Sequence, residues 1–478
     1  MAITRRQFLK TALGAGMALQ VPGVLFHAFS AGAATANVRE FRFTASKAKV
    51  NLGRGPDFVA WTYNGQVPGP EIRVKEGETI RVYLKNFLPE ETTIHWHGLP
   101  IINGMDGVPG VTQAGVQSGE SFIYEFEAGS AGSFLYHSHV GYQLDQGLYG
   151  PLIIEPVHDP GNYDREYTLL LEDWVMKDGG GVAPTRRRSP MGMGMMGGMM
   201  RGRRFRNNGG PLLEPVYDGY AVNGRVSPAI EPLTVTKGER VKLRLINPSS
   251  STIYTLRLAG HSLTITHTDA NPVEPFKTDV LRIGMGERYD VEFKADNPGF
   301  WLLSAMETGG GEGQLRIPIR YKGVQSSEPV PPVFEGPLRF VTYGDLQTKL
   351  PDESPSQGRI DRGFRQVLRG GMHSPYWTIN GRVYPNAERL VVKKGDRVRI
   401  SYWNRSMMPH PMHLHGHFFR LVNPSIAPDM WILKDTVIVD PMQGMEIEFV
   451  ADNVGKWFHH CHNLYHMVAG MANTVVYA

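Results

Sequence analysis

The sequence predicts an all-β protein made of consecutive β-sandwich domains. Its length of 478 residues corresponds to roughly three domains of about 150 residues each. A strand-like motif also occurs three times, and its copies end at Asn86, Asn247 and Asn404, about 160 residues apart. Two independent observations therefore predict three domains of similar size.

Each copy of the motif has the pattern of a half-buried strand. The copies occupy residues 72–86, 233–247 and 390–404, and in each a glycine turn precedes alternating apolar and polar residues. The apolar positions are Ile80, Val82 and Leu84 in the first copy, Val241, Leu243 and Leu245 in the second, and Val398, Ile400 and Tyr402 in the third. Upstream of each copy an Asn-Gly pair, at 64–65, 223–224 and 380–381, predicts a tight turn. Each unit is therefore expected to form a β-sandwich of short strands.

Residues 1–36 are expected to be a twin-arginine signal peptide. Arg5 and Arg6 lie within a Thr-Arg-Arg-Gln-Phe-Leu-Lys run, which is followed by a short apolar stretch and by small residues at 30–36. The alternative is an N-terminal membrane anchor, which the short and Gly-rich apolar stretch disfavours. We therefore expect a periplasmic or otherwise exported protein that does not span the membrane once the signal is removed.

The mature chain is expected to divide into domains at 37–157, 158–325 and 326–478. Lys and Arg total 50 against 46 Asp and Glu, so the charge balance indicates neither a nucleic-acid partner nor a membrane-surface role. The single cysteine, Cys461, excludes a disulfide framework within the chain. This thiol must have another role.

Histidine pairs occur at equivalent positions of the first and third copies. Two pairs follow the strand-ending asparagines and two follow Gly132 and Gly455 at fixed offsets; they are His95/His97, His413/His415, His137/His139 and His460/His462. At the same offsets the second copy has Leu256/Leu258 and Ser304/Met306. This pattern predicts a site built jointly by the first and third domains, with the second domain acting as a spacer.

The spacing of these pairs favours a copper cluster. Residues i and i+2 of a strand point to the same face, so each pair directs two imidazoles to one place. Eight neutral imidazoles suit several copper ions better than one zinc ion, which usually takes four ligands. Cys461 lies between His460 and His462 and must point to the opposite face, toward a different metal.

Ligands for this second metal lie close to Cys461 in the sequence. His410 has opposite strand parity to His413, and His466 and Met471 follow Cys461 at intervals of five residues. Two histidines, a cysteine and a distant methionine form the trigonal blue-copper set, a one-electron site. The first copy lacks it, with Thr92, Ser138, Gln143 and Leu148 at the matching positions.

Together these motifs resemble the four copper motifs of the multicopper oxidase family over almost the whole mature chain. The resemblance implies three consecutive cupredoxin-like Greek-key β-sandwich domains and four copper ions, one type 1, one type 2 and two type 3. It implies type 2 ligands His95 and His413, type 3 ligands His97, His137 and His462 for one ion and His139, His415 and His460 for the other, and type 1 ligands His410, Cys461, His466 and Met471. The implied activity is one-electron oxidation of a substrate at type 1 copper, coupled to four-electron reduction of O2 to water.

An acidic residue is also expected to serve the cluster. Asp106 resembles the family's carboxylate behind the trinuclear site, which helps protons reach bound oxygen; the alternative is a simple turn former. Bacterial relatives often have an acid directly after the second type 1 histidine, whereas this chain has Met467. Proton delivery is therefore expected to depend more on Asp106 or to use another route. His417 and His459, beside the motifs, are expected to pack or to support ligands.

The substrate is less directly indicated. Segment 186–206 is rich in Arg, Gly and Met and predicts a mobile loop; its methionines are Met191, Met193, Met195, Met196, Met199 and Met200. Thioethers favour Cu(I), so the segment is expected to recruit cuprous ions, the alternative being a linker whose methionines cover an apolar patch. The run from Cys461 to Met467 and Met407-Met408 resemble the CopA-type copper-resistance subgroup.

Three functions follow as hypotheses. The first is a cuprous oxidase of copper tolerance that also oxidises phenols in the manner of laccases, with Cu(I), phenolic small molecules and O2 as partners. The second is a laccase-like phenol oxidase in which the Met-rich segment is incidental. The third, a non-catalytic cupredoxin scaffold or copper-binding protein, is disfavoured because all four histidine pairs are present. A monomer is expected in each case.

Overall fold

The computed structural model describes residues 37–158, 161, 163–176, 214–307, 315–350, 359–371 and 374–478. The expected signal peptide and the six methionines of segment 186–206 lie outside these residues. The described chain contains no helix whose length and hydrophobicity would let it span a bilayer.

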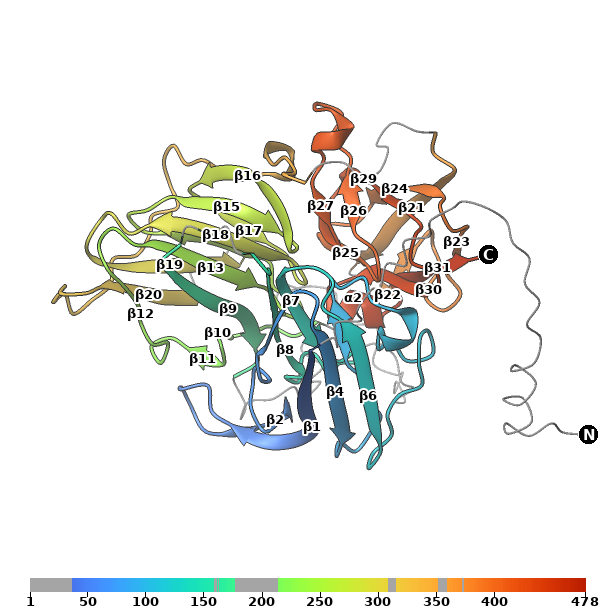
Figure 1. Cartoon of the computed structure of the whole chain (residues 1–478), viewed down its shortest axis with the longest axis horizontal. Coiled ribbons are helices and arrows are strands. Elements are labelled where there is room, and N and C mark those ends of the chain that lie inside the picture. Colours follow the sequence, from blue (N-terminus) through green and yellow to red (C-terminus); the bar gives the residue numbers. More distant parts are fainter. Residues whose placement is uncertain are drawn as a thin grey trace, which may run out of the picture. The chain divides into compact units, whose positions relative to one another are not determined.

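The first third of the chain forms two four-stranded sheets, with strand orders β2-β1-β4-β6 and β3-β8-β7-β5 (Figure 1). The pairs β1/β4 and β3/β8 are parallel, and the other pairs are antiparallel. The elements are β1 (Val38–Val50), β2 (Phe58–Tyr63), β3 (Ile72–Lys75), β4 (Thr79–Asn86), β5 (His95–His97), the 3-10 turn η1 (Asn103–Met105), β6 (Ser121–Glu127), β7 (Gly132–His137) and β8 (Tyr149–Glu155).

The middle third forms larger sheets, with orders β11-β10-β9-β13-β18-β15-β16 and β12-β20-β19-β14-β17. Its strands are β9 (Arg165–Trp174), β10 (Gly219–Val222), β11 (Arg225–Val226), β12 (Leu233–Val235), β13 (Arg240–Ile246), β14 (Tyr254–Leu258), β15 (Leu263–Thr268), β16 (Asn271–Thr278), β17 (Leu281–Ile283), β18 (Arg288–Lys294), β19 (Phe300–Glu307) and β20 (Leu315–Tyr321).

The last third forms sheets of order β22-β21-β24-β29-β26-β27 and β23-β31-β30-β25-β28. Its elements are η2 (Tyr343–Asp345), β21 (Arg362–Gly371), β22 (Ser374–Ile379), β23 (Leu390–Val392), β24 (Arg397–Asn404), β25 (His410–Leu414), β26 (Phe419–Leu421), η3 (Pro428–Met430), β27 (Leu433–Lys434), β28 (Thr436–Val439), β29 (Gly444–Val450), β30 (Lys456–Cys461), α2 (Leu464–Val468) and β31 (Ala472–Tyr477). The all-β sandwich architecture expected from the sequence is thus confirmed in all three copies.

The three copies share local structure for physical reasons. Asn64, Asn223 and Asn380 have φ of 57°, 49° and 52°, and the following glycines also have positive φ, as tight hairpin turns require. At the strand ends Asn86, Asn247 and Asn404 are fully buried. Each donates its side-chain amide to two backbone carbonyls and accepts the backbone N–H two residues later. The repeated asparagine therefore fixes the loop that leads out of each strand.

Strand β13, in the middle copy, is more deeply buried than the half-buried strand expected from the sequence. In β4 and β24 inward residues are buried and most outward residues are partly exposed, whereas in β13 both faces are buried. Its polar residues Lys242 and Arg244 pair with Asp290, at 3.1 and 3.0 Å, and Arg244 also donates to Ser133 of β7. The first copy packs against this face, so the expectation of a solvated face was wrong for β13.

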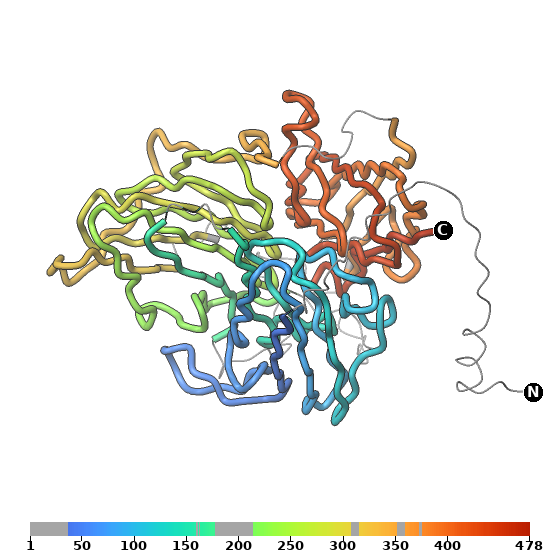
Figure 2. Tube along the Cα trace, viewed as in Figure 1, coloured from blue at the N-terminus to red at the C-terminus, as the bar shows by residue number. Residues whose placement is uncertain are grey.

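Hydrophobic cores join the three copies. The largest cluster includes Leu243 and Ile265 of the middle third together with Ile400 and Cys461 of the last third. A second cluster combines residues of all three thirds, among them Leu135, Trp174 and Tyr465. In Figure 2 the blue-to-cyan, green-to-yellow and orange-to-red parts of the trace accordingly come together near the middle of the view.

Candidate metal centres

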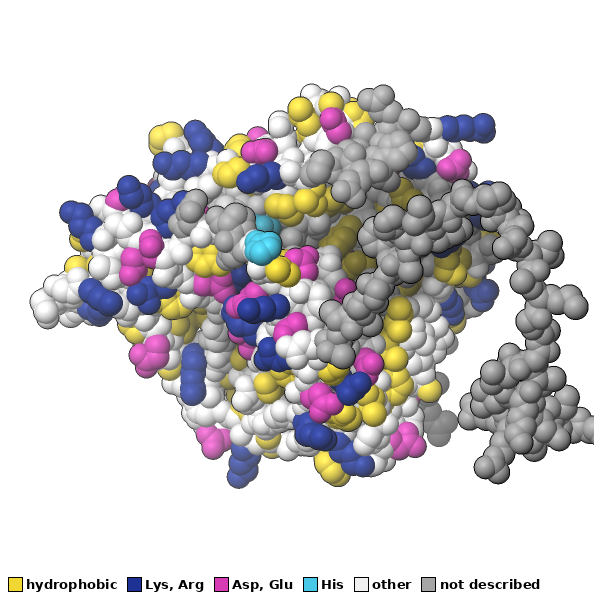
Figure 3. Space-filling view, in the orientation of Figure 1, with side chains coloured by type: hydrophobic (Ala, Val, Ile, Leu, Met, Phe, Trp, Pro, Cys, Tyr) yellow, Lys and Arg dark blue, Asp and Glu magenta, His cyan; other side chains and the backbone are white. Residues whose placement is uncertain are grey.

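Four strands of the first and last copies place eight histidines together. In β5 and β7, His95 faces His137 across the sheet, and in β25 and β30, His413 faces His460. All eight side chains of the pairs predicted from the sequence are buried, none exposing more than 8% of its surface. Histidine is accordingly scarce on the face shown in Figure 3, where Lys, Arg, Asp and Glu are interspersed.

Only the His95/His97 pair lies entirely within a strand. The other three pairs straddle strand ends, because β7 ends at His137, β25 ends at Leu414 and β30 ends at Cys461. The alternation that directs paired side chains to one face therefore holds strictly in β5, and at the other pairs the chain turns toward the cluster after the first histidine.

Ring nitrogens within the cluster form small groups. The nitrogens of His139, His415 and His460 lie within 4.8 Å of one another, and the Nε2 of His460 is 3.4 Å from that of His139 and 3.1 Å from that of His415. Two further groups of this kind are His95/His413/His415 and His95/His97/His137. The ring of His462 lies beside these groups. Its centroid is 4.9 Å from the ring centroid of His97 and 5.3 Å from that of His137.

The cluster has the chemistry of a metal site. A buried polar atom without a partner is costly, yet five ring nitrogens that face this space lack any hydrogen bond: His95 Nε2, His97 Nδ1, His137 Nε2, His413 Nε2 and His462 Nε2. Burial lowers the pKa of seven of the imidazoles below the ordinary value, and neighbouring imidazoles add to this effect; they are His97, His137, His139, His413, His415, His460 and His462. Neutral rings with free lone pairs are what copper requires, so these residues fit the group that the sequence predicts.

Asp106 lies directly behind the cluster. It follows η1 and is almost fully buried. Both of its carboxylate oxygens lie 3.1 Å from His415 Nδ1, and its backbone carbonyl accepts from His95 Nδ1 at 2.8 Å. Its contacts are therefore with two predicted ligands, beyond what a turn former needs.

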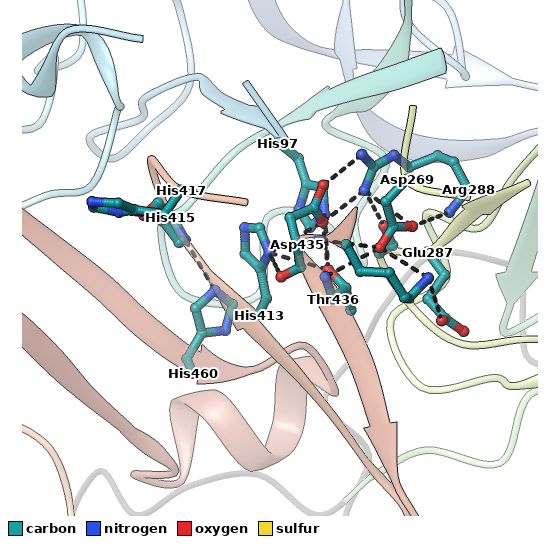
Figure 4. Close-up of polar contacts among 12 residues, drawn as sticks. His97, Asp269, Glu287, Arg288, His413, His415, His417, Asp435, Thr436 and His460 are labelled. Atoms are coloured by element: carbon teal, nitrogen blue, oxygen red, sulfur yellow. Dashed lines mark hydrogen bonds and ion pairs between the residues drawn. The ribbon is translucent and has the colours of Figure 1, made fainter. Parts of the chain in front are cut away.

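A second carboxylate, Asp435, contacts two other members of the cluster, His97 and His413 (Figure 4). Its Oδ1 lies 3.2 Å from His97 Nε2, and its carbonyl accepts from His413 Nδ1 at 2.9 Å. Burial by itself would raise the pKa of Asp435, but Arg288, His413 and His97 hold it well below its usual range. No repeat or motif in the sequence marks Asp435, so it was not among the predicted site residues.

The second predicted centre surrounds Cys461. Its Sγ lies 3.6 Å from His410 Nδ1 and from His466 Nδ1, and these two nitrogens are 3.1 Å apart. Met471 is fully buried in the same core, and its carbonyl accepts the Cys461 N–H. The chain therefore presents Cys461 to one set of histidines and its two neighbours to another, as the parity argument predicted.

Surrounding residues orient this centre. His410 Nε2 lies 2.8 Å from Ser406 Oγ, and the side chain of Asn463 accepts the N–H groups of Tyr465 and His466 at the start of α2. The Trp377 ring packs on that of His466, with centroids 3.8 Å apart. Burial lowers the pKa of His410 to about 3 and raises the pKa of the Cys461 thiol above its ordinary value. A metal that binds here must therefore displace the thiol proton.

The remaining histidines near the motifs have structural contacts. His459 bonds Tyr402 and Asn473, and His417 bonds Tyr477 and the His415 carbonyl, so both nitrogens of each ring are occupied. Met467 packs against two apolar clusters.

Comparison with known proteins identifies the class of protein. Family models described as multicopper oxidase match residues 44–159, 165–322 and 361–478. The chain belongs to the multicopper oxidase family, and it is an oxidoreductase that uses O2. The family resemblance predicted from the sequence is thereby confirmed.

Individual relatives are similar over nearly their whole length. The chain is 38% identical to the multicopper oxidase MmcO of Mycobacterium tuberculosis, over 91% of this chain and 86% of that protein. It is 27% identical to copper resistance protein A of Escherichia coli, over 99% and 98% of the two chains. Among solved structures, Fet3p, a multicopper oxidase that functions in iron import, has a TM-score of 0.78 at 23% identity over 92% of this chain and 90% of that one.

Proposed function

We propose that the eight-histidine cluster binds three copper ions and that Cys461, His410, His466 and Met471 bind a fourth. The observation that carries this proposal is the position of Cys461, whose sulfur faces His410 and His466 while the adjacent His460 and His462 face the cluster. His139, His415 and His460 form one predicted type 3 set, and the groups around His95, His97 and His413 supply the remaining ligands. Bound copper would supply one-electron chemistry at the Cys461 centre and O2 reduction at the cluster.

The protein's own groups define the electron and proton routes in this proposal. Cys461 is covalently joined to His460 and His462, and the His460 Nδ1–H donates to the Cys461 carbonyl at 2.9 Å, which gives a short path between the two centres. Asp106 contacts His415 and His95 from behind and is placed to hold a proton beside the cluster. Met467 has no acidic group, so in this proposal proton delivery depends more on Asp106 than it does where an acid follows the second type 1 histidine.

We propose Cu(I) as the physiological reductant, in copper tolerance. The name of the Escherichia coli relative, the methionines of segment 186–206 and the softness of thioether ligands support this substrate. The twin-arginine sequence supports export to the periplasm. We also propose the domain division at 37–157, 158–325 and 326–478, which the family matches to residues 44–159, 165–322 and 361–478 support as three consecutive units.

A phenolic substrate is the second candidate, because a carboxylate near His466 is able to bind it. A carboxylate oxygen of Glu214 lies 4.0 Å from His466 Nε2, and this buried nitrogen has no hydrogen-bond partner in the described structure. A phenol hydroxyl that donates to Glu214 would bring its ring next to His466. The same carboxylate would also attract a cuprous ion, so the contact alone does not separate the two substrates.

The decisive experiment compares steady-state oxidation of Cu(I) and of a bulky phenol by one copper-loaded preparation. We expect a large preference for Cu(I) that falls on deletion of residues 186–206, because the methionines that gather the ion are lost. Phenol oxidation by the same deletion variant is the matched control and should be unchanged. Unchanged Cu(I) oxidation kinetics after the deletion would contradict the hypothesis that this segment recruits Cu(I). A preference for the phenol would favour the laccase-like alternative.

The copper assignment itself is tested by Cys461→Ser. The wild-type protein should bind four copper ions and show the intense thiolate-to-copper absorption, and the variant should lose that absorption and one copper ion. Binding of fewer than four ions by the metal-replete wild type would contradict the proposal.

A further inference from the structure

A network of buried charges connects the middle domain to the trinuclear cluster (Figure 4). From the middle domain it includes Asp269, Glu287 and Arg288, and from the last domain Lys434 and Asp435. None of these side chains exposes more than 1% of its surface. Groups this deeply buried are costly to charge unless their partners are well placed. The middle domain was expected to act only as a spacer, and this network gives it a specific contact with the site.

Arg288 is the centre of the network and touches all three domains. Its NH1 and NH2 groups donate to the two carboxylate oxygens of Asp435 at 2.8 and 2.6 Å, in the bidentate geometry that a guanidinium favours. Its Nε donates to the carbonyl of Ser133 in β7 at 3.1 Å, and NH1 also donates to the carbonyl of Gly286 at 3.0 Å. One side chain is thus bound to strand β7, to its own loop and to the carboxylate beside the cluster.

Asp435 passes this constraint to two predicted ligands. Its Oδ1 lies 3.2 Å from His97 Nε2 and also accepts the hydroxyl of Thr436 at 2.8 Å. The Thr436 oxygen is in turn 3.1 Å from His413 Nδ1. With these nitrogens engaged, His97 directs Nδ1 and His413 directs Nε2 into the cluster, and those are two of the atoms that lack any other partner.

Asp269 fixes the backbone at the same place. Its Oδ2 lies 3.3 Å from the N–H of Asp435 and 3.2 Å from that of Thr436, and it pairs with Lys434 at 3.0 Å. Its other oxygen accepts the N–H of Arg288. The Asp269 carboxylate of the middle domain therefore holds the main chain at Asp435 and Thr436 of the last domain close to Arg288.

Two glycines show how little space surrounds this contact. A Cβ on Gly286 would lie 2.9 Å from ring carbons of both His97 and His462, and φ there is +82°. A Cβ on Gly98 would lie 2.4 Å from Arg288 NH2. The middle-domain loop thus forms a wall of the cluster, and the guanidinium fills the space behind it.

We propose that Arg288 is a positioning residue of the trinuclear site, through which the middle domain orients His97 and His413 by way of Asp435. This inference rests on the proposed function, because it assigns the two histidines to the copper cluster. Without the bidentate contact from Arg288, the Asp435 carboxylate can rotate. The rings of His97 and His413 then lose their fixed direction. Removal of such a supporting contact typically weakens metal binding by about 10- to 100-fold.

The test compares Arg288→Met with Arg244→Met. Arg244 is a second buried middle-domain guanidinium, which contacts Ser133, Asp290 and Glu166 and, among the described residues, forms no hydrogen bond or ion pair with a predicted ligand. We expect Arg288→Met to lose the type 2 electron paramagnetic resonance signal or to shift it clearly, to bind about one copper ion fewer, and to keep the type 1 absorption. Arg244→Met should lose thermal stability but retain all copper and an unaltered type 2 signal.

Two further variants keep the proposal testable if Arg288→Met fails to fold. Arg288→Lys retains the positive charge but cannot form the bidentate contact with Asp435. Asp435→Asn retains the shape of the side chain but weakens its hydrogen bonds to Arg288. Both variants should shift the type 2 signal. An unaltered type 2 signal and full copper content in whichever of these variants fold would overturn the proposal and leave Arg288 a structural ion pair. Loss of the signal in Arg244→Met as well would also overturn it. Failure of the wild type to bind four copper ions would instead contradict the proposed function.

Discussion

At the scale of single residues, four of the predicted ligands, His95, His137, His413 and His415, have one ring nitrogen committed to the protein. The Nδ1–H groups of His95, His137 and His413 donate to backbone carbonyls, and Nδ1 of His415 faces Asp106. Because these bonds fix the tautomer and the ring direction before any metal binds, the other nitrogen is already directed into the cluster. The cost of leaving those nitrogens unpaired is the thermodynamic reason to expect strong metal binding.

A second residue-scale feature is a buried carboxyl far from the copper ligands. Glu172 in β9 is 1% exposed and accepts from Trp174 Nε1 and the Gly224 N–H. Burial raises its pKa from 4.5 to about 8. Between these values the folded state binds more protons than the unfolded state, so this group's contribution to stability is complete below about pH 4.5 and is lost as pH rises through about 8.

Glu172→Gln should remove this pH dependence, because the amide stays neutral. The difference in unfolding free energy, variant minus wild type, should rise by a few kcal/mol between pH 5 and pH 8, at about 1.4 kcal/mol per unit of pKa shift. Denaturant titrations at each pH measure it, and the shared histidines cancel in the difference. Glu239→Gln is the matched control: Arg165 lowers the pKa of Glu239 to about 2, so its difference should stay constant over this range. A constant difference for Glu172→Gln would contradict the prediction.

At the scale of elements, the repeated strand-ending asparagine gives a comparison within one chain. Asn247 and Asn404 form equivalent bonds, but only Asn404 lies next to a predicted ligand: its Oδ1 accepts the N–H and hydroxyl of Ser406, whose Oγ contacts His410 Nε2. The sequence revealed this repeat because side-chain bonds within one loop impose the same residue at each copy. It did not reveal the buried face of β13, because that burial arises from a different domain.

Replacing each asparagine by alanine separates stability from metal geometry. Asn247→Ala loses three buried hydrogen bonds and Asn404→Ala loses four, and each variant should lose on the order of 2–4 kcal/mol of unfolding free energy. Only Asn404→Ala should also shift the type 1 absorption, since Ser406 no longer holds His410. Denaturation and visible spectra of the two copper-loaded variants measure these effects, and an equal spectral shift in Asn247→Ala would show that the change is not local.

At the scale of the whole molecule, what the sequence could predict depended on how the contacts are encoded. The three copies and both ligand sets were predicted from spacing within each copy; nine of the ten predicted histidines and Cys461 lie in groups whose ligand atoms are within 4.8 Å of one another, and the ring centroid of His462 lies 4.9 Å from that of His97. Arg288 and Asp435 are 147 positions apart. Their contact depends on how the middle domain packs against the last, which no local pattern records. The packing of the domains therefore determines which residues support the ligands, such as Arg288 and Asp435. The local repeats determine the ligands themselves.

Because the ligands come from two domains, the stability of the molecule should depend on bound copper. Ligands from β5 and β7 of the first domain meet those from β25 and β30 of the last, so bound copper joins two domains that are distant in sequence. A ligand that binds only the folded state stabilises it by about 4 kcal/mol when its concentration is 1,000 times its dissociation constant. Chelation should therefore lower the unfolding temperature, and readdition of copper should restore it.

Hydrogen exchange should locate the effect. In the copper-free protein, amides of β5, β7, β25 and β30 should exchange faster, because the five ring nitrogens that face the cluster and lack a partner favour local opening between the first and last domains. Strands β14, β19 and β20 of the middle domain bind no copper and provide the internal reference, and their protection should be unchanged. Equal loss of protection in those strands would mean that copper stabilises the fold as one cooperative unit and that no separate opening of the first and last domains precedes it.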